Sequence, residues 1–471
     1  MVDRHMPFAK WYTTSMTRAQ RLVLLVSILA SFVAFLDGSI VNVALPAISR
    51  ELGGGLITQQ WVVDAYLITL GSLILLAGSL SDLFGRQHIL NAGLIGFVAA
   101  SLLCAVAPSA FILIVARALQ GVAGALLVPS SLALIMSSFT GKEQGKAIGS
   151  WTAWTGISFV VGPLLGGFLV DSASWRLVFA INVIPVALCL WLLRFMEKPE
   201  RPKNAKVDLL GAVLCSGGLS GSVFALIEQP HYGWVSGRIL VPLIGGLLAL
   251  AIFVWHESRS PIAMLPLSLF QVRNFSVGNI ATVGIYGGLA IATFLIVIYL
   301  QQVSGYSALS AGVALLPITI IMFFLSSRFG ALAGKYGPRL FMTSGPLLVG
   351  VGFLMMLGIS EHVNYWTQLF PGVMVFGLGM SVTVAPLTAA VLGDITPTRS
   401  GIASAVNNAV ARIAGLVTIA FAGVIVGDHV SLQGFRRTIL ITAVLVMSGG
   451  VISWLGIRNH AVAEPEAAPT V

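Results

Sequence analysis

Long apolar runs alternate along the chain with short segments that contain glycine, proline and charged residues. Each run is about 20 residues long, the length of a helix that crosses the hydrocarbon core of a bilayer. The runs are continuous rather than alternating between apolar and polar residues, which favours helices over a membrane β-barrel. The pattern predicts fourteen spans, at residues 22–45, 58–79, 88–107, 110–136, 147–170, 177–195, 208–227, 238–255, 275–300, 308–328, 340–358, 366–392, 401–426 and 438–457.

The composition of the 471 residues agrees with this pattern. Hydrophobic residues make up 57% of the chain and charged residues 9%, whereas a soluble protein carries roughly 25% charged residues. We therefore predict an all-α polytopic membrane protein; a disordered chain, a nucleic-acid-binding protein and a water-soluble enzyme all fit poorly. The cysteines lie inside apolar runs and form no Cys/His cluster, so neither a metal site nor a disulfide framework is predicted.

The net charge of +9 is unevenly distributed along the chain. With the N-terminus placed in the cytoplasm, 19 of the 26 lysines and arginines fall in inner tails and loops, five in outer loops and two inside spans. Cytoplasmic loops of membrane proteins carry such an excess of basic residues. The distribution predicts that both termini are cytoplasmic, and it favours a topology signal over a nucleic-acid-binding surface.

An internal repeat relates the two ends of the chain. The segment Gly78–Arg86 follows the second span, and the similar segment Gly330–Gly337 follows the tenth span, 252 residues later. Two similar six-helix halves with a site between them are typical of a rocking transporter. We predict a cytoplasmic N-terminal tail at 1–21, a six-helix bundle at 22–195, a linker with two inserted transmembrane helices and a cytoplasmic loop at 196–274, a second six-helix bundle at 275–457 and a cytoplasmic C-terminal tail at 458–471.

Four charged residues lie deep inside predicted spans, where a charge costs roughly 2.5–3.5 kcal/mol. Asp37, Asp64 and Arg117 all lie roughly 9–12 Å below the outer surface at a rise of about 1.5 Å per residue. These three side chains are therefore expected to meet in the outer half of the first bundle. Arg412 lies nearer the midplane, in the opposite half.

The deep carboxylates have two interpretations. Burial disfavours the charged form of a carboxyl group, and a nearby guanidinium favours it, so protonation of Asp37 and Asp64 beside Arg117 can change with conformation. Such a group meets the requirement of a proton-coupling site. The alternative is a static ion-pair network that fixes helix packing. Arg412 is open to the same two interpretations, because Asn407 and Asn408 lie one turn earlier.

Aromatic and amide side chains suggest a substrate cavity. Trp151 and Trp154 are three residues apart, on one face of the fifth span, where they line a cavity or sit at the membrane interface. Gln301 and Gln302 end the ninth span, where they can donate to a polar group in the outer vestibule.

Several motifs resemble those of one transporter family. The fourteen predicted spans and the segment 36–46, which contains Asp37 and Asn42, resemble the fourteen-helix drug:proton antiporters of the major facilitator superfamily. Arg117–Gly121 is similar to the superfamily's motif B, whose arginine is linked to proton transfer. The resemblance implies the major facilitator fold, two six-helix bundles plus two inserted helices, and it adds Asn42, Asn407, Asn408 and Arg412 to the residues expected to line the substrate cavity.

Two further motifs extend the resemblance. One is similar to the loop motif A, which is expected to act in gating, and its matching residues are Gly78, Asp82, Gly85 and Arg86. The other is similar to motif C, the antiporter motif of exporters, in which a proline kinks a helix and glycines allow close packing. Its residues are Gly156, Gly162, Pro163, Gly166 and Gly167. The second-half copy of motif A departs from the family pattern, because Gly334 replaces its aspartate.

These features predict a proton-coupled antiporter that exports small amphipathic compounds across the bacterial inner membrane by alternating access. We expect small-molecule substrates, protons and the lipid bilayer as partners, a monomer, and neither a cofactor nor a metal. A symporter or an exporter of one metabolite would show the same helices. An intramembrane enzyme or a receptor is a more distant alternative, since the sequence holds no HExxH, GxSxG or Walker A pattern.

Overall fold

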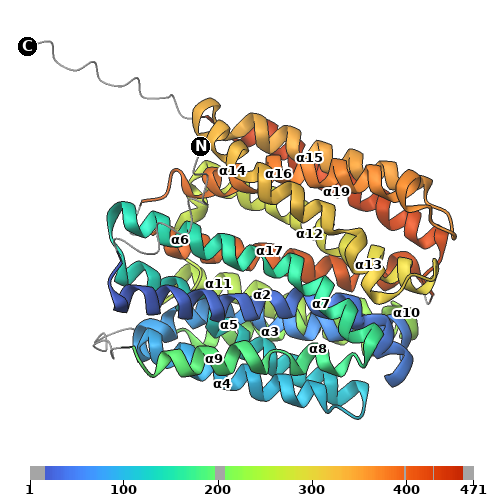
Figure 1. Ribbon diagram of the computed structural model, residues 1–471, viewed down its shortest axis with the longest axis horizontal. Coiled ribbons are helices and arrows are strands. Elements are labelled where there is room, and N and C mark those ends of the chain that lie inside the picture. The colour runs from blue at the N-terminus through green and yellow to red at the C-terminus, as the bar shows by residue number, and fades with distance from the viewer. Residues whose placement is uncertain (1–15, 197–206, 397–398, 428, 460–471) are drawn as a thin grey trace, which may run out of the picture.

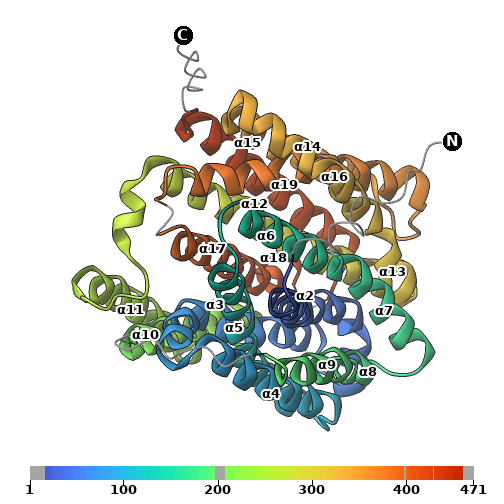
Figure 2. The same cartoon turned by 60° about the vertical axis from the view of Figure 1, so that its left-hand side comes forward.

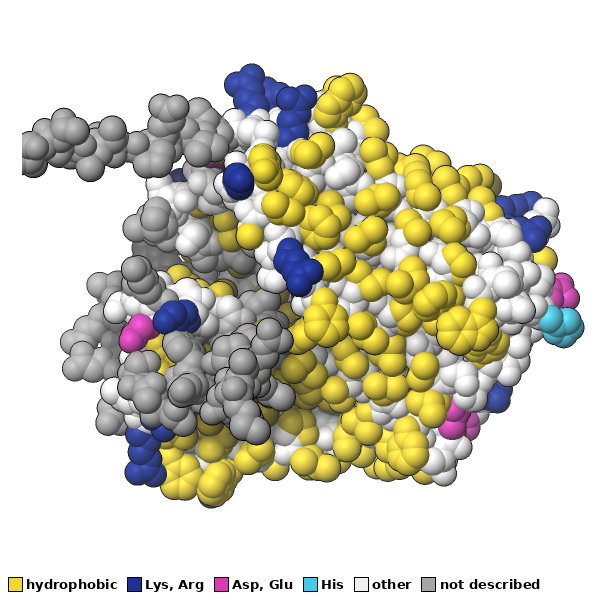
Figure 3. Space-filling model, turned by 45° about the horizontal axis from the view of Figure 1, so that its top comes forward, with side chains coloured by type: hydrophobic (Ala, Val, Ile, Leu, Met, Phe, Trp, Pro, Cys, Tyr) yellow, Lys and Arg dark blue, Asp and Glu magenta, His cyan; other side chains and the backbone are white. Residues whose placement is uncertain are grey.

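The computed structural model describes residues 16–196, 207–396, 399–427 and 429–459, except for the side chains of Asp82, Gly141 and Lys142. Within these ranges, fourteen helices are long and apolar enough to cross a membrane, which confirms the number of predicted spans. Most charged side chains lie toward the two ends of the molecule, and hydrophobic side chains cover the face between them (Figure 3). This distribution suits a protein surrounded by lipid tails.

Two bundles lie side by side (Figure 1). The first bundle holds α2 (Arg18–Leu52), α3 (Gly55–Phe84), α4 (Arg86–Ala105), α5 (Ala110–Ser138), α6 (Gly141–Gly156), α7 (Ser158–Ser172), α8 (Arg176–Ala180) and α9 (Val183–Leu193). The second holds α12 (Arg273–Gln302), α13 (Ala308–Ala314), α14 (Leu316–Tyr336), α15 (Pro338–Met355), α16 (Phe370–Leu392), α17 (Ser400–Ala420), α18 (Ala422–Val426) and α19 (Leu432–Gly456). Short helical turns add η1 (Leu267–Gln271), η2 (Met356–Gly358) and η3 (Tyr365–Leu369).

The inserted helices α10 (Leu209–Tyr232) and α11 (Gly237–Arg259) form a hairpin beside the bundles (Figure 2). A Cβ built on Gly221 would lie 2.6 Å from the Pro242 carbonyl, and one built on Gly246 would lie 2.6 Å from the Ser222 nitrogen. Glycine therefore permits the close approach of the two helices, as in other membrane helix pairs. The hairpin meets the first bundle where Trp61 of α3 donates to Glu228 of α10, at 2.9 Å.

Each of the two repeated segments contains one glycine with a positive φ. Gly85 (φ 93°) separates α3 from α4, and Gly337 (φ 85°) separates α14 from α15. These glycines are 252 residues apart, so the repeat seen in the sequence is a repeat of structure. The predicted loop boundaries are wrong, because α3 continues to Phe84 and α14 to Tyr336. The turn between the helices needs a residue with a positive φ, which glycine adopts most easily. Each helix therefore continues up to its glycine.

The fifth span contains a one-residue break, and the proline predicted to kink it lies beyond that break. The break between α6 and α7 falls at Ile157, whereas Pro163 lies inside α7. Pro163 removes the N–H that would bond to the carbonyl four residues earlier, which weakens the first turns of α7. Gly156 directly precedes the break and has a low helix propensity, which explains why α6 ends at this glycine.

The bundles contact each other closely at one end. We call the end where α2 meets α3 the Glu51 end, and the opposite end, at the α3–α4 turn, the Gly85 end. A Cβ built on Gly167 of α7 would overlap the Cα of Leu309 in α13, and one built on Gly312 would lie 2.7 Å from the Pro163 carbonyl. These approaches join α7 and α13, which begins at the Glu51 end.

Candidate functional site

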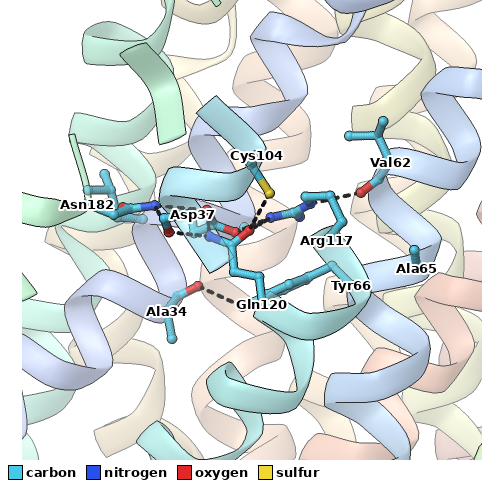
Figure 4. Close-up of polar contacts among 12 residues, drawn as sticks. Ala34, Asp37, Val62, Ala65, Tyr66, Cys104, Arg117, Gln120 and Asn182 are labelled. Atoms are coloured by element: carbon cyan, nitrogen blue, oxygen red, sulfur yellow. Dashed lines mark hydrogen bonds and ion pairs between the residues drawn. The ribbon is translucent and has the colours of Figure 1, made fainter. Parts of the chain in front are cut away.

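A buried ion pair lies inside the first bundle. The Asp37 carboxylate on α2 accepts from Nη1 of Arg117 on α5, with an Oδ2–Nη1 distance of 2.6 Å (Figure 4). The two side chains are 0% and 2% exposed. The predicted proximity of these residues is therefore confirmed.

Two amides hold the other carboxylate oxygen. Asp37 Oδ1 accepts from Nε2 of Gln120 at 2.9 Å and from Nδ2 of Asn182 at 3.1 Å. Both amide nitrogens also donate to the hydroxyl of Ser101 on α4, at 2.7 Å and 3.3 Å. With Arg117, the carboxylate accepts three hydrogen bonds, so both of its oxygens have partners in this arrangement.

The guanidinium is held on its other side by α3. Its Nε donates to the carbonyl of Val62 at 2.9 Å, and its Nη1 donates to Oε1 of Gln120 at 2.6 Å. The ring of Tyr66 lies 4.3 Å from the guanidinium carbon, a cation–π distance. Four helices and the segment before α9 thus contribute to one polar cluster, formed by Asp37, Tyr66, Ser101, Arg117, Gln120 and Asn182.

This cluster can couple a proton to helix packing. Removing one partner of a buried ion pair typically costs 3–5 kcal/mol, because the other charge is left unpaired. Protonation of Asp37 has a comparable effect on Arg117, since it cancels the negative charge that the arginine pairs with. The packing of the helices that carry the two residues therefore depends on the charge of Asp37.

The prediction that Asp64 joins this pair is wrong. Neither of its buried carboxylate oxygens has a hydrogen-bond partner among the residues that the structure describes. Gln60, one turn earlier, bonds to α17, and Gly71 also packs against α17, so Asp64 lies on the α17 side of α3. Val62, whose carbonyl accepts from Arg117, lies about 200° away around the helix axis. Any role of Asp64 in proton coupling stays a prediction.

The structure describes three of the four motif A residues in full. Gly85 forms the turn, and Arg86 donates from Nη1 to the carbonyl of Ala133 on α5, at 3.1 Å. The side chain of Asp82 lies outside the described residues. Gly78 is helical, and a Cβ built on it would contact nothing within 4 Å. The positive φ of Gly85 therefore favours glycine at this position, whereas neither the backbone nor the packing requires a glycine at Gly78.

Motif C allows close packing at three of its four glycines. A Cβ on Gly162 would overlap Ser39 Oγ, and one on Gly166 would lie 2.6 Å from Ile40 Cγ1, so α7 packs directly on α2. Gly167 makes the approach to α13 described above. Gly156, which belongs to the motif but not to the glycines expected to allow close approach, has open space around its Cβ position.

Three side chains bind backbone groups across the two bundles. Gln301, predicted in the outer vestibule, instead donates from α12 to the carbonyl of Val43 on α2, at 3.0 Å. Gln60 donates to the carbonyls of Ile419 and Ala420 on α17, at 2.7 and 3.0 Å. The Asp171 carboxylate accepts from the N–H groups of Ala308 and Leu309, at 3.0 and 2.9 Å. Together these contacts hold the Glu51 end closed.

We expect Asp171→Ala to weaken this closure. Its carboxylate lies at the N-terminus of α13, where a negative charge contributes about 0.3–1 kcal/mol. Loss of about 1 kcal/mol would increase the population open at the Glu51 end about fivefold. Spin-label distances between Cys variants of Ser172 and Ser310 would measure the change. Asp171→Asn should fall between the variant and the parent, because it keeps one acceptor oxygen; an unchanged distance distribution in both variants would exclude the role.

The other residues predicted to line a substrate cavity lie in several surroundings. Trp151 donates to Ser31 Oγ on α2, at 3.0 Å, whereas Trp154 is 49% exposed. Asn407 donates to Asn279 and Thr282 of α12, at 3.1 and 3.0 Å. The structure thus ties Trp151 and Asn407 into helix packing and leaves Trp154 exposed.

Three more of these residues retain exposed surface. Asn42 is partly buried and Gln302 and Asn408 are exposed, and Asn408 donates to the carbonyl of Ser404 in its own helix. Arg412 lies with its guanidinium carbon 5.8 Å from the ring centroid of Phe35, across the interface between the bundles.

Sequence reasoning did not select four members of the polar cluster as site residues: Tyr66, Ser101, Gln120 and Asn182. Gln120 is one turn after Arg117, so its position on the same helix face was a usable signal. Ser101 and Tyr66 gave no such signal, because serine and tyrosine are common in apolar spans and only the packing of α3, α4 and α5 brings them to the arginine.

Comparisons with known proteins agree on the family. The model of the Major Facilitator Superfamily matches residues 27–332 and 291–470. The chain is 34% identical to multidrug resistance protein Stp of Mycobacterium tuberculosis, over 88% of this chain and 78% of that protein. It is 32% identical to a methylenomycin A resistance protein of Bacillus subtilis, over 93% and 94% of the two chains.

Solved structures agree on the fold. A peptide transporter in complex with sulfate matches with a TM-score of 0.69 at 14% identity, over 94% of this chain and 95% of that one. A D-xylose-proton symporter matches with a TM-score of 0.66 at 14% identity, over 94% and 98% of the two chains. The sequence matches, the fourteen helices and the two bundles place this chain in one family: it belongs to the major facilitator superfamily.

Proposed function

We propose that the protein is a proton-coupled antiporter that exports small amphipathic compounds by alternating access. The observation that carries the proposal is the buried ion pair of Asp37 and Arg117, which places a carboxyl group inside a helix bundle. Relatives named as multidrug or antibiotic resistance proteins support export as the direction. The packing of the motif C glycines Gly162 and Gly166 on α2 is consistent with the same class.

The pair supplies the coupling. A proton that reaches Asp37 neutralises it, which weakens its hold on Arg117 and on the amides of Gln120 and Asn182. The arginine keeps its bond to the carbonyl of Val62 on α3, so α3 and α5 move relative to α2. Because α3 also packs against α17, this movement reaches the second bundle. Release of the proton on the opposite side of the membrane restores the pair.

The Gly85 end faces the cytoplasm in this proposal. The excess of basic residues lies in the predicted inner loops, and cytoplasmic loops carry such an excess. Both termini are then cytoplasmic, and the membrane is the bacterial inner membrane. The Glu51 end, which these contacts hold closed, then faces outward. We propose that the monomer completes the cycle.

Purified protein in liposomes tests the proposal. An imposed pH gradient should drive movement of an amphipathic dye, and collapse of the gradient with a protonophore should stop it. Dye movement in the protein-containing liposomes that equals the movement in protein-free liposomes, with the gradient present, would contradict proton-coupled transport.

A further inference from the structure

Arg412 lies between the two bundles, and the part of the chain that the structure describes gives its guanidinium no hydrogen bond or ion pair. Arg412 is on α17 where this helix crosses α3, because a Cβ built on Gly71 would lie 3.8 Å from the Arg412 Cβ. Its Nε is buried and finds no hydrogen-bond acceptor within the described ranges. Among the described residues, its guanidinium makes a ring contact with Phe35 but no hydrogen bond or ion pair. Arg412 as a whole is only partly buried, so its guanidinium, with a donor at Nε that is not in use, has a vacant anion-binding capacity in this conformation.

The deep carboxylates do not compensate this charge. Both carboxylate oxygens of Asp37 already accept hydrogen bonds inside the first bundle, from Arg117, Gln120 and Asn182. Asp64 faces α17, but farther toward the Glu51 end: Gln60 lies opposite Ile419 and Gly71 lies opposite Arg412, so Asp64 falls between these two contacts. Its oxygens have no partner, which excludes a bond to the arginine. The region around Arg412 therefore carries an unbalanced positive charge.

Aromatic rings stand beside the guanidinium. The Phe35 ring lies 5.8 Å from the Arg412 guanidinium carbon and 5.9 Å from the ring of Phe159 on α7. Phe159 is 48% exposed, so part of its ring is available to another molecule. Side chains from α17, α2 and α7 thus combine a cation with an aromatic surface.

We propose that Arg412, Phe35 and Phe159 form a substrate site for small aromatic anions. The planar guanidinium matches a carboxylate or sulfonate, and the phenylalanine rings offer a surface for the aromatic ring of the same molecule. A cationic drug would meet an uncompensated positive charge there. This substrate class rests on the proposed export function and makes it more specific.

Tyr66 connects this site to the proton site. Its ring packs on the Arg117 guanidinium at 4.3 Å, and its hydroxyl donates to the carbonyl of Ala34, at 3.4 Å, next to Phe35 in the chain. When protonation of Asp37 releases Arg117, Tyr66 and the neighbouring Phe35 lose a fixed support. Proton binding therefore alters the wall of the anion site.

Three compounds with one ring system test the site: 2-naphthoate, 2-naphthylmethanol and 2-naphthylmethylammonium. Binding is measured by calorimetry on the protein in lipid nanodiscs, and transport is measured in liposomes under a pH gradient. The parent protein should bind 2-naphthoate at least tenfold more tightly than the ammonium compound. Arg412→Gln should lower the affinity for 2-naphthoate at least tenfold and leave the ammonium compound unchanged. Arg437→Gln, a matched change of an exposed arginine at the start of α19, should alter neither.

A second variant separates the contribution of the aromatic contact to binding from the contribution of the charge. Phe159→Ala should weaken all three compounds by a similar factor, since it removes ring contact and no charge. A parent protein that prefers the ammonium compound, or an Arg412→Gln variant that keeps full affinity for 2-naphthoate, would overturn the anion site. If gradient-driven transport of the ammonium compound persists in that case, the export function stands and only the substrate class is wrong. Loss of every gradient-driven flux in the parent protein would instead contradict the export function itself.

Discussion

Asp37→Asn should reduce gradient-driven transport at least 100-fold while the protein still folds. Asparagine has nearly the same volume as aspartate and cannot change its charge with pH, so the proton cycle loses its titratable group. Arg117 keeps its bonds to the carbonyl of Val62 and to Gln120, which limits the structural damage. Flux of an amphipathic dye in liposomes, compared at equal amounts of reconstituted protein, measures the effect.

The matched control is Glu51→Gln. Glu51 is also an acid at a helix end of the first bundle, and it accepts from Trp175 and Arg176 at the Glu51 end of the molecule. It is exposed, so its ion pair is expected to contribute little. Glu51→Gln should retain most of the flux, and both variants should elute as single symmetric peaks in detergent. Wild-type flux in Asp37→Asn would remove Asp37 from the coupling mechanism.

The sequence predicts the helices and the central ion pair because both depend on position along the chain. Residue counts locate each apolar run, and the same counts place Asp37 and Arg117 at one depth. The repeat of 252 residues likewise predicts equivalent turns, which the structure finds at Gly85 and Gly337. Depth and periodicity are thus available without coordinates.

Rotation about the helix axis and the state of the transporter are harder to predict. Asp64 has the correct depth for the ion pair but lies on the opposite side of α3 from Val62, and depth along the chain does not determine which face of α3 meets α5. Gln301 is predicted in an open vestibule, yet it bonds to Val43 because this end of the bundles is closed. One sequence encodes several states, so it does not specify which contacts belong to this one.

The contacts of Arg117 require the several N–H groups of a planar guanidinium. Its Nε donates to the carbonyl of Val62, and its Nη1 donates to both Asp37 and Gln120. These acceptors belong to three helices, α3, α2 and α5. A lysine ammonium is a single point donor, so it can pair with the carboxylate but cannot hold the Val62 carbonyl from a separate nitrogen. Lysine also loses the planar stack on Tyr66.

Arg117→Lys should therefore keep the positive charge and lose most of the transport. Loss of one hydrogen bond from a charged group costs about 1.5–3 kcal/mol, which corresponds to a decrease of roughly 10–100-fold in flux if the bond couples α3 to the proton site. Measurement of flux across a pH series separates coupling from folding, because a variant that is merely destabilised would lose amplitude without moving its pH profile. Arg437→Lys, at an exposed position, is the control and should match the parent. A full rate and an unchanged profile in Arg117→Lys would show that charge alone suffices and that the fork does not link α3 to Asp37.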